Sequence, residues 1–213
     1  MKALIITIAA FIAAAHIANA QDPGFEYYKS NEVKTLMGRN RQGGAYLGIT
    51  TGYSSIDNKH AVLFGGRLSW IASKSLGIGI GGTGFINEYH YEPSIDREVF
   101  LAGGYGGIYI EPILFPRSPV HLSFPVLLGA GGISYVSADY DFGSNFIEDS
   151  DPFLLFEPAG EIELNMSRFF RMAFGASYRF PTPFNIGTSG TDFVRASSLK
   201  GWSCMVSFKF GKF

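Results

Sequence analysis

The feature that most constrains the fold is a regular alternation of large apolar residues with polar or small ones. Val120, Leu122 and Phe124, for example, alternate with His121 and Ser123. Successive side chains of a β-strand point to opposite faces, so a period of two indicates a strand. Each such run predicts a strand with one apolar face and one polar or glycine-rich face.

Eight runs of this kind follow one another along the chain. They cover residues 44–54, 60–71, 76–91, 98–114, 120–136, 152–166, 170–180 and 199–210. About 9–11 residues are enough for a tilted strand to cross a lipid bilayer. The runs reach that length, which predicts strands that can span a membrane.

The segments between the runs alternate in length. Short connections lie near 72–75, 115–119 and 167–169, and mostly longer, more polar ones lie near 55–59, 92–97, 137–151 and 181–198. Short turns on one side and long loops on the other are typical of an outer-membrane barrel with both chain ends in the periplasm. The predicted fold is all-β, an eight-stranded antiparallel up-and-down transmembrane β-barrel.

The first 20 residues have the pattern of a cleaved secretory signal peptide. Lys2 precedes a mostly apolar run, and the small residues Ala18 and Ala20 precede Gln21. The run is shorter and earlier than a spanning helix requires, which makes a signal anchor the weaker alternative. Gln21 stands where a lipoprotein would have cysteine, so a lipid anchor is not indicated. The predicted organisation is a signal peptide at 1–20, a periplasmic segment at 21–41 and a barrel at 42–213.

Composition excludes several other classes of protein. The chain has 27 Gly, 20 Phe and 11 Tyr, with 16% charged residues and a formal net charge of −1. This is not the basic footprint of a nucleic-acid-binding protein. The single cysteine, Cys204, excludes an intramolecular disulfide framework. After the signal, no segment has the length and apolar continuity of a transmembrane helix, so a closed barrel is the available way to enter a bilayer.

A soluble β-sandwich would also bury an apolar face, so alternation alone does not separate a core from a lipid-facing surface. The aromatic residues favour lipid, because membrane proteins gather aromatic side chains at the two bilayer interfaces. On the predicted strands, Trp70 and Phe210 fall near the periplasmic rim. The outer rim carries Tyr53, Tyr178, Phe180 and Trp202.

Two stretches complete the pattern, "FPVLLGAGGISY" at 124–135 and the terminal "FKFGKF" at 208–213. Together with the signal and the eight runs, they make the chain resemble the small outer-membrane β-barrel proteins of Gram-negative bacteria, particularly the glycine-rich barrels of Bacteroidota. The resemblance covers about residues 42–213 and brings no catalytic motif. It implies insertion by the barrel-assembly machinery, which reads the last strand and its terminal aromatic residue. We expect a monomer that contacts outer-membrane lipid and lipopolysaccharide, with loops available to a surface ligand and no nucleic-acid partner.

Two features depart from an ideal barrel. Pro112, Pro125 and Pro158 lie within strands, and each removes a hydrogen-bond donor from a barrel that has no free edge. We expect a bulge or a short strand break at each proline. Phe213 falls off the outward parity of the last strand, which predicts a bend at Gly211 or a chain end that leaves the sheet.

Residues 77–82, "GIGIGG", match the spacing G-x-G-x-x-G. A dinucleotide site requires a helix that opens at those glycines, whereas Thr83, Gly84 and Phe85 continue the strand pattern. We therefore interpret the inward glycines as space for large side chains across a narrow lumen. These glycines are Gly77, Gly79, Gly81, Gly103, Gly107, Gly129 and Gly131.

His121 and Ser123 raise an enzymatic alternative, because some outer-membrane lipid A deacylases use a His-x-Ser pair on a barrel strand. A base and a nucleophile two residues apart on a strand share a face, so the two could meet. That face is predicted to be the lumen near the periplasmic turn, whereas lipid A lies outside in the outer leaflet. We favour a structural histidine, and a deacylase-like enzyme is the alternative function.

The stretch Ser137–Asp151 is acidic and contains no Lys or Arg. Its carboxylates are Asp139, Asp141, Glu148, Asp149 and Asp151. Calcium favours such oxygen ligands, but Gly143 and Ser150 stand where an EF-hand loop needs ligands. A solvated loop is favoured over a site for calcium or lipopolysaccharide-bridging cations, so no metal or cofactor is predicted.

The sixth and seventh runs carry their apolar residues at even numbers, so a tight turn near 167–169 fixes their register. The expected pairs are Leu164 with Met172, Asn165 with Arg171 and Glu157 with Arg179. Inward charges in a narrow lumen are costly unless they pair. We expect a network built from Glu157, Glu161, Glu163, Arg171 and Arg179, joined by Arg67 and Glu111.

These observations predict a small integral outer-membrane barrel with a structural or surface-interaction role. Eight-stranded barrels are usually filled by side chains, so we expect a plugged lumen without steady conductance. A diffusion pore is the least favoured class. No catalytic, cofactor-binding or metal-binding residue is predicted.

Overall fold

The computed structural model describes residues 43–72, 74–92, 97–137, 150–183 and 196–213. The chain divides into residues 1–41 and 42–213, and all described residues belong to the second part. The predicted signal peptide at 1–20 and periplasmic segment at 21–41 lie outside the described residues, as does most of the acidic loop. In the described part of the chain, no helix is long and apolar enough to cross a membrane.

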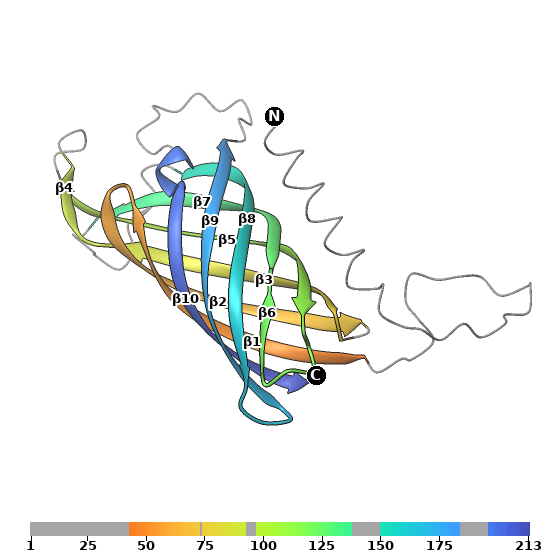
Figure 1. Cartoon of the computed structure of the whole chain (residues 1–213). Coiled ribbons are helices and arrows are strands. Elements are labelled where there is room, and N and C mark those ends of the chain that lie inside the picture. The colour runs from red at the N-terminus through yellow and green to blue at the C-terminus, as the bar shows by residue number, and fades with distance from the viewer. Residues whose placement is uncertain (1–42, 73, 93–96, 138–149, 184–195) are drawn as a thin grey trace, which may run out of the picture. The chain divides into compact units, whose positions relative to one another are not determined.

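The described strands form one antiparallel sheet that closes on itself (Figure 1). They are β1 Gly44–Ile56, β2 Lys59–Ala72, β3 Leu76–Asn87, β4 His90–Glu92, β5 Arg97–Leu114, β6 Val120–Ser123, β7 Val126–Ser137, β8 Ser150–Asn165, β9 Phe170–Pro183 and β10 Gly201–Lys212. A short 3-10 helix, η1 at Ala196–Leu199, precedes β10. Pairing of β1 with β10 closes the barrel, with Ala45 opposite Lys212.

The barrel wall has eight strands, as the sequence predicted. β4 prolongs β3, because both pair with β5. β6 and β7 are the two halves of one strand, since both lie between β5 and β8. We call the end of the barrel with Ala45 and Lys212 the terminal end, and the opposite end the loop end.

The strand prolines interrupt the ladders without changing the register. Pro125 lies in the gap between β6 and β7, and its carbonyl accepts a hydrogen bond from the Ala159 N–H at 2.8 Å. The Pro112 carbonyl accepts from the Phe124 N–H at 2.9 Å. Pro158 interrupts the pairing of β8 with β9. The register is the same on both sides of each gap, so no proline causes a bulge. The expected strand break is confirmed at Pro125, whereas β5 and β8 continue through Pro112 and Pro158 with a gap in the pairing on one side.

The connections at the terminal end are short, as predicted, but one at the loop end is shorter than expected. Asp57 and Asn58 alone join β1 to β2, with φ of 56° and 57°. Positive φ at both central residues is the geometry of a type I′ hairpin turn. The longer loop predicted near 55–59 was therefore wrong, because Asp-Asn tolerates the left-handed conformation that such a turn requires.

Side chains alternate between the lumen and the outside as their parity predicted. In β2, Arg67 and Ser69 are buried, whereas Leu68 and Trp70 are 56% and 49% exposed. In β6, His121 and Ser123 are buried and Val120 is exposed. The same parity assigns Glu157, Glu161 and Glu163 of β8 and Arg171 and Arg179 of β9 to the lumen.

Buried side chains lie in successive layers along the lumen. An apolar cluster occupies the loop end and consists of Ile56, Ala61, Leu63, Phe85, Leu101, Tyr105, Leu127, Ile133, Phe153, Leu155 and Leu199. A smaller apolar cluster at the terminal end joins Tyr46, Ile71 and Ile113 with Phe213. Polar and charged side chains lie between these two clusters.

Phe213 lies at the mouth of the lumen. β10 continues through Gly211, which pairs with Tyr46. The rings of Phe213 and Tyr46 stack with centroids 5.8 Å apart. The predicted bend at Gly211 was wrong, because β10 continues to Lys212. Phe213 alone lies beyond the strand, and it keeps the inward parity of Lys209.

The inward glycines give room to large groups, as interpreted from the sequence. A Cβ atom at Gly81 would lie 2.7 Å from Cβ of Arg67, and one at Gly131 would lie 2.6 Å from Cβ of Tyr105. Gly107 and Gly129 face each other and approach main-chain atoms instead. Residues 77–82 lie within β3, so the glycine motif does not open a helix.

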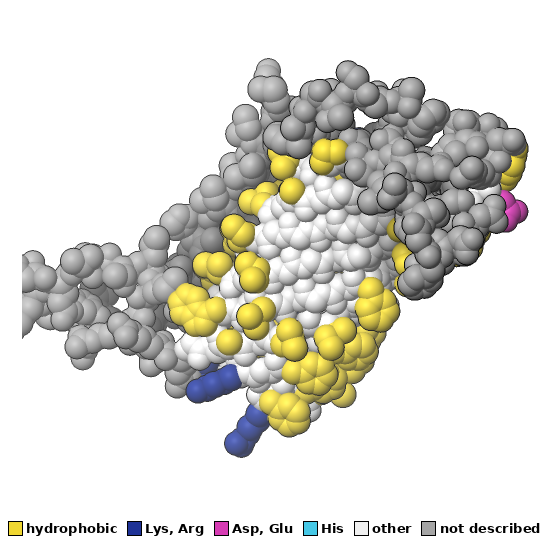
Figure 2. Space-filling model, turned by 180° about the vertical axis from the view of Figure 1, so that it is seen from behind, with side chains coloured by type: hydrophobic (Ala, Val, Ile, Leu, Met, Phe, Trp, Pro, Cys, Tyr) yellow, Lys and Arg dark blue, Asp and Glu magenta, His cyan; other side chains and the backbone are white. Residues whose placement is uncertain are grey.

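A second set of glycines points outward on four neighbouring strands, β2, β3, β5 and β7. The cross-strand pairs are Gly66 with Gly82, Gly82 with Gly106, Gly84 with Gly104 and Gly104 with Gly132. Figure 2 shows a broad area without hydrophobic side chains on one face of the barrel, with hydrophobic side chains around it. The outer side of the wall around Gly82 and Gly106 therefore carries little side-chain mass.

Alanine at Gly107 should impair folding, whereas alanine at Gly132 should be tolerated. A Cβ atom at Gly107 would lie 2.1 Å from the Leu128 carbonyl oxygen, but at Gly132 it would meet no atom within 4 Å. Overpacking a tight interior costs about 1–3 kcal/mol. The folded fraction can be read from the gel shift between boiled and unboiled samples. Equal folding of the two variants would contradict the tight packing at Gly107.

A buried charge network as the candidate functional site

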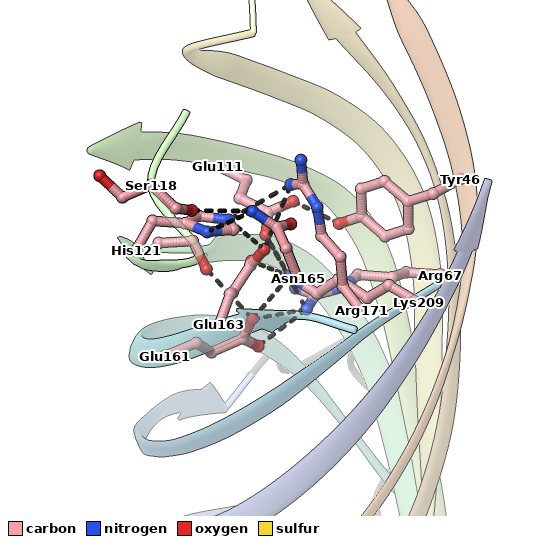
Figure 3. Close-up of polar contacts among 11 residues, drawn as sticks. Tyr46, Arg67, Glu111, Ser118, His121, Glu161, Glu163, Asn165, Arg171 and Lys209 are labelled. Carbon is pink, nitrogen blue, oxygen red and sulfur yellow. Dashed lines mark hydrogen bonds and ion pairs between the residues drawn. The ribbon is translucent and has the colours of Figure 1, made fainter. Parts of the chain in front are cut away.

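Ionisable side chains from six different strands meet inside the barrel toward the terminal end (Figure 3). The members are Arg67 on β2, Glu111 on β5, His121 on β6, Glu161 and Glu163 on β8, Arg171 on β9 and Lys209 on β10. Each of them is 6% exposed or less. We call these seven residues the charge network. They converge because each occupies an inward position on its strand.

Lys209 is the hub of the charge network. Its Nζ donates hydrogen bonds to Glu111 at 2.6 Å, to Glu161 at 2.8 Å and also to Glu163. These three carboxylates lie near enough to one another to hold a metal ion. The ammonium group already occupies the position between them, and its three donors match the three acceptors. The arrangement is therefore an internal salt bridge in which lysine takes the place of a metal.

Arg67 is the second cation that contacts Glu161, after Lys209. Its Nη2 donates to both carboxylate oxygens of Glu161 at 2.8 Å and lies 4.0 Å from Glu111. The guanidinium carbon is 5.8 Å from the ring centroid of Tyr46 and 5.6 Å from that of Tyr109. Aromatic faces attract cations at such distances. The Tyr46 hydroxyl also donates to Glu111, so the ring and its polar tip both contact the charge network.

His121 and Arg171 share Glu163 on the side nearest the terminal end. His121 Nε2 lies 2.8 Å from Glu163 Oε2, and Arg171 Nη1 lies 3.4 Å from the same oxygen. Asn165 donates to the Ser118 carbonyl at 2.8 Å and lies 3.5 Å from His121 Nδ1. The imidazole is thus held between a carboxylate and an amide inside the lumen.

Beside His121, the charge network contains three carboxylates and three Lys or Arg cations. Glu111, Glu161 and Glu163 contribute three carboxylates, and the matching cations are Arg67, Arg171 and Lys209. Removing an isolated charge from water costs several kcal/mol, and a paired charge recovers that cost when its hydrogen bonds are satisfied. Burial of so many charges is tolerable here because they neutralise one another.

Glu157 and Arg179 form a separate polar group closer to the loop end. Both side chains are buried on the lumen side. Phe156 pairs with Phe180, and this is the predicted register, in which Glu157 lies opposite Arg179. Glu157 accepts a hydrogen bond from Ser177 at 2.6 Å. Arg179 donates to the Leu199 carbonyl at 2.9 Å and to Ser54 Oγ at 2.5 Å.

The register predicted for β8 and β9 is therefore confirmed. Among the residues that the structure describes, however, Arg179 does not form the ion pair that the predicted network of charges gave it. Arg179 also donates to Ser203, so its contacts within the described residues are to neutral oxygens. The reason is its position beside η1, whose last carbonyl needs a donor. This arginine anchors the connection from η1 into β10, whereas the predicted contact of Glu163 with Arg171 is present.

A cavity of about 40 Å³ separates the charge network from this second polar group. Arg67 and Glu161 line one part of it, and Glu157 and Ser177 line another. A buried water molecule needs a cavity of roughly 10–15 Å³, measured as the space open to its centre, and several polar partners. The cavity therefore has room for a few water molecules.

The geometry does not assemble the catalytic pair of the deacylase-like alternative. Ser123 Oγ donates to Glu161 at 3.2 Å, and the Nε2 of His121 is occupied by Glu163. Ser123 is completely buried and His121 is 1% exposed. Neither side chain can meet a lipid outside the barrel, so both act as internal hydrogen-bonding groups.

The sequence prediction of the charge network missed Lys209, left out His121 and missed Tyr46, which contacts the network through Glu111. Lys209 and Tyr46 carried a usable signal, because each has the inward parity of its strand. Lys209 lies between the outward residues Phe208 and Phe210, where a lysine facing the lumen needs carboxylate partners. The partners themselves lie across the barrel and could not be identified from spacing along the chain.

Comparison with solved structures places this barrel among a known set of folds. Neisserial surface protein A matches with a TM-score of 0.51 and 14% sequence identity, covering 80% of this chain and 97% of its own. The N-terminal β-barrel domain of Pseudomonas aeruginosa OprF matches with a TM-score of 0.47 and 8% identity, covering 80% of this chain and 99% of its own. No protein-family model matches the sequence, and no curated protein matches it significantly. The chain has the fold of a small outer-membrane β-barrel.

Replacing Lys209 with methionine should destabilise the folded barrel strongly. The substitution leaves three neighbouring carboxylates without their shared ammonium, and breaking a buried ion pair on one side costs about 3–5 kcal/mol. Lys212→Met is the matched control, because Lys212 is exposed at the end of the same strand and should change stability by about 0.5 kcal/mol or less. Urea unfolding in lipid vesicles measures both. A similar loss in the two variants would contradict the role of Lys209 as hub.

Proposed function

We propose that this chain is a small integral β-barrel of the outer membrane of a Gram-negative bacterium, with a structural or surface-interaction role. The observation that carries the proposal is the apolar outer surface of the barrel. Leu47, Phe64 and Ile80 are 53%, 65% and 63% exposed at outward positions of β1, β2 and β3. Soluble monomers rarely expose large contiguous apolar patches, whereas an outer-membrane barrel needs an apolar band around its wall.

The distribution of charge supports the same location. In the described strands, the charged side chains away from the strand ends, such as Arg67 and Lys209, point into the lumen. Exposed cations lie at turns and strand ends, as Arg117 and Arg168 do. A charge on the lipid-facing surface of a barrel is costly at the bilayer centre and nearly free of cost at the interfaces.

The aromatic belts support an orientation across the membrane. Trp70 and Phe210 are exposed near the terminal end, beside Ala45 and Leu47. The belt near the loop end consists of Tyr53, Tyr178, Phe180 and Trp202. We place the terminal end in the periplasm, because outer-membrane barrels have their short turns on that side.

The proposal includes a lumen closed by side chains. The apolar cluster at the loop end, the charge network and the smaller cluster around Phe213 lie one after another along it. An eight-stranded barrel has an interior just wide enough for side chains to fill. A diffusion pore would require this filling to move aside.

The partners we propose follow from this location. The outer surface contacts lipid and lipopolysaccharide, the loops contact a surface ligand, and insertion as a monomer depends on the barrel-assembly machinery. We retain the likeness to glycine-rich barrels of Bacteroidota as part of the proposal. An enzymatic role is not proposed, because the two candidate side chains, His121 and Ser123, are buried on the lumen side of the barrel.

After cell fractionation, the protein should be recovered with outer membranes and should resist extraction by carbonate. Ile80→Arg should reduce this recovery, because Ile80 points outward within β3 and a cation at the bilayer centre costs about 2–4 kcal/mol. Ser55→Arg is the control, since Ser55 also points outward but lies at the loop end, where the cost is about 0–1 kcal/mol.

Recovery of the unsubstituted protein mainly in the soluble periplasm would overturn the proposed location. Equal recovery of the two arginine variants would show that the outer surface does not face hydrocarbon.

A further inference from the structure

A basic cleft opens at the terminal end of the barrel. Its volume is about 210 Å³, and its walls are Ile71, Lys74, Pro116, Arg117, Arg171 and Phe213. Lys74 comes from the turn after β2, Arg117 from the turn after β5, and Arg171 from β9. None of these wall side chains is acidic. Three cations from separate elements thus face one small space.

No nearby carboxylate side chain of the described residues neutralises the positive charge of Lys74 and Arg117. The three carboxylates of the charge network are matched by Arg67, Lys209 and Arg171 itself. No carboxylate side chain of the described residues forms an ion pair with Lys74 or Arg117. Lys74 and Arg117 therefore leave a surplus of positive charge at the cleft that exceeds the single α-carboxylate of the wall residue Phe213, and a bound anion would offset it.

Arg171 is held in place and keeps unused hydrogen-bonding capacity. Its guanidinium carbon lies 3.8 Å from the ring centroid of Phe213, and its Nη1 contacts Glu163 at 3.4 Å. The side chain is 6% exposed, yet its buried Nε has no hydrogen-bond partner among the described residues. An arginine fixed in this way loses little conformational freedom when it binds a ligand.

We propose that this cleft binds an oxyanion, namely a single phosphate group. Arginine matches the geometry of phosphate oxygens, and lysine adds a mobile point charge. The volume is below the ~300–1,000 Å³ of sites for drug-sized ligands, which favours a single phosphate group. The phosphate can belong to a soluble ion or to a phospholipid headgroup at the membrane surface. The inference rests on the geometry of the cleft, independently of the cellular location.

Titration of inorganic phosphate into the folded barrel tests the proposal directly. The protein is held in a non-ionic detergent without phosphate groups at low salt, and binding is followed by calorimetry and by the shift in unfolding temperature. We expect saturable binding that Lys74→Ala combined with Arg117→Ala weakens at least tenfold. Arg168→Ala combined with Lys212→Ala is the matched control, because it removes two exposed cations from the same end that do not line the cleft.

The control variant should keep the affinity of the unsubstituted protein within about twofold. Absence of saturable binding by the unsubstituted barrel, or an equal loss in both double variants, would overturn the site. Boiled and unboiled gel samples verify that each variant is folded. Arg117→Gln is a second variant in case the double substitution impairs folding, and it should weaken binding by itself.

Lipid nanodiscs distinguish the two sources of phosphate. The titration is repeated in nanodiscs of zwitterionic lipid with and without phosphatidic acid. Competition by phosphatidic acid in the unsubstituted protein supports the site and assigns it to a lipid headgroup. Saturable binding without competition supports the site and assigns it to soluble phosphate. Competition of equal size in the Lys74 and Arg117 double variant would overturn the site.

Discussion

The interaction on which the interior depends is the contact of one ammonium group with three carboxylates. Lys209 on β10 reaches Glu111 on β5 and Glu161 and Glu163 on β8. These strands are distant in sequence, so the contact fixes how they are placed around the lumen. A shift of one strand by a single residue would turn its charge toward the outside, where pairing is lost. The charge network thus stabilises one register over its alternatives.

The outer surface and the lumen are two consequences of the same alternation. Leu68 faces outward because Arg67 faces inward, and Phe208 and Phe210 face outward on either side of Lys209. Lipid can solvate the outward apolar side chains, whereas the inward charged side chains must find their hydrogen-bond partners within the barrel. Inward glycines such as Gly81 provide the space that Arg67 needs for its contacts. The apolar exterior and the polar interior are therefore linked strand by strand.

Sequence patterns predicted what depends on parity and on local pairing. The faces of β2 and β8, the register of Leu164 with Met172 and the contact of Arg171 with Glu163 follow from numbering alone. The partners of Lys209 depend on the curvature that brings β5, β8 and β10 together across the lumen, which spacing does not encode. Arg179 binds η1, an element too short to leave a periodic signal. The two-residue turn at Asp57 was not predicted, because alternation places the end of a strand only to within a few residues.

Electrical recording from planar bilayers tests the central claim most directly, because that claim is a lumen closed by paired charges between apolar layers. Folded protein is reconstituted at a known ratio, and an open porin serves as the positive control for insertion. The account predicts no steady conductance above the lipid background. A stable open channel formed by the folded, unsubstituted barrel would contradict it.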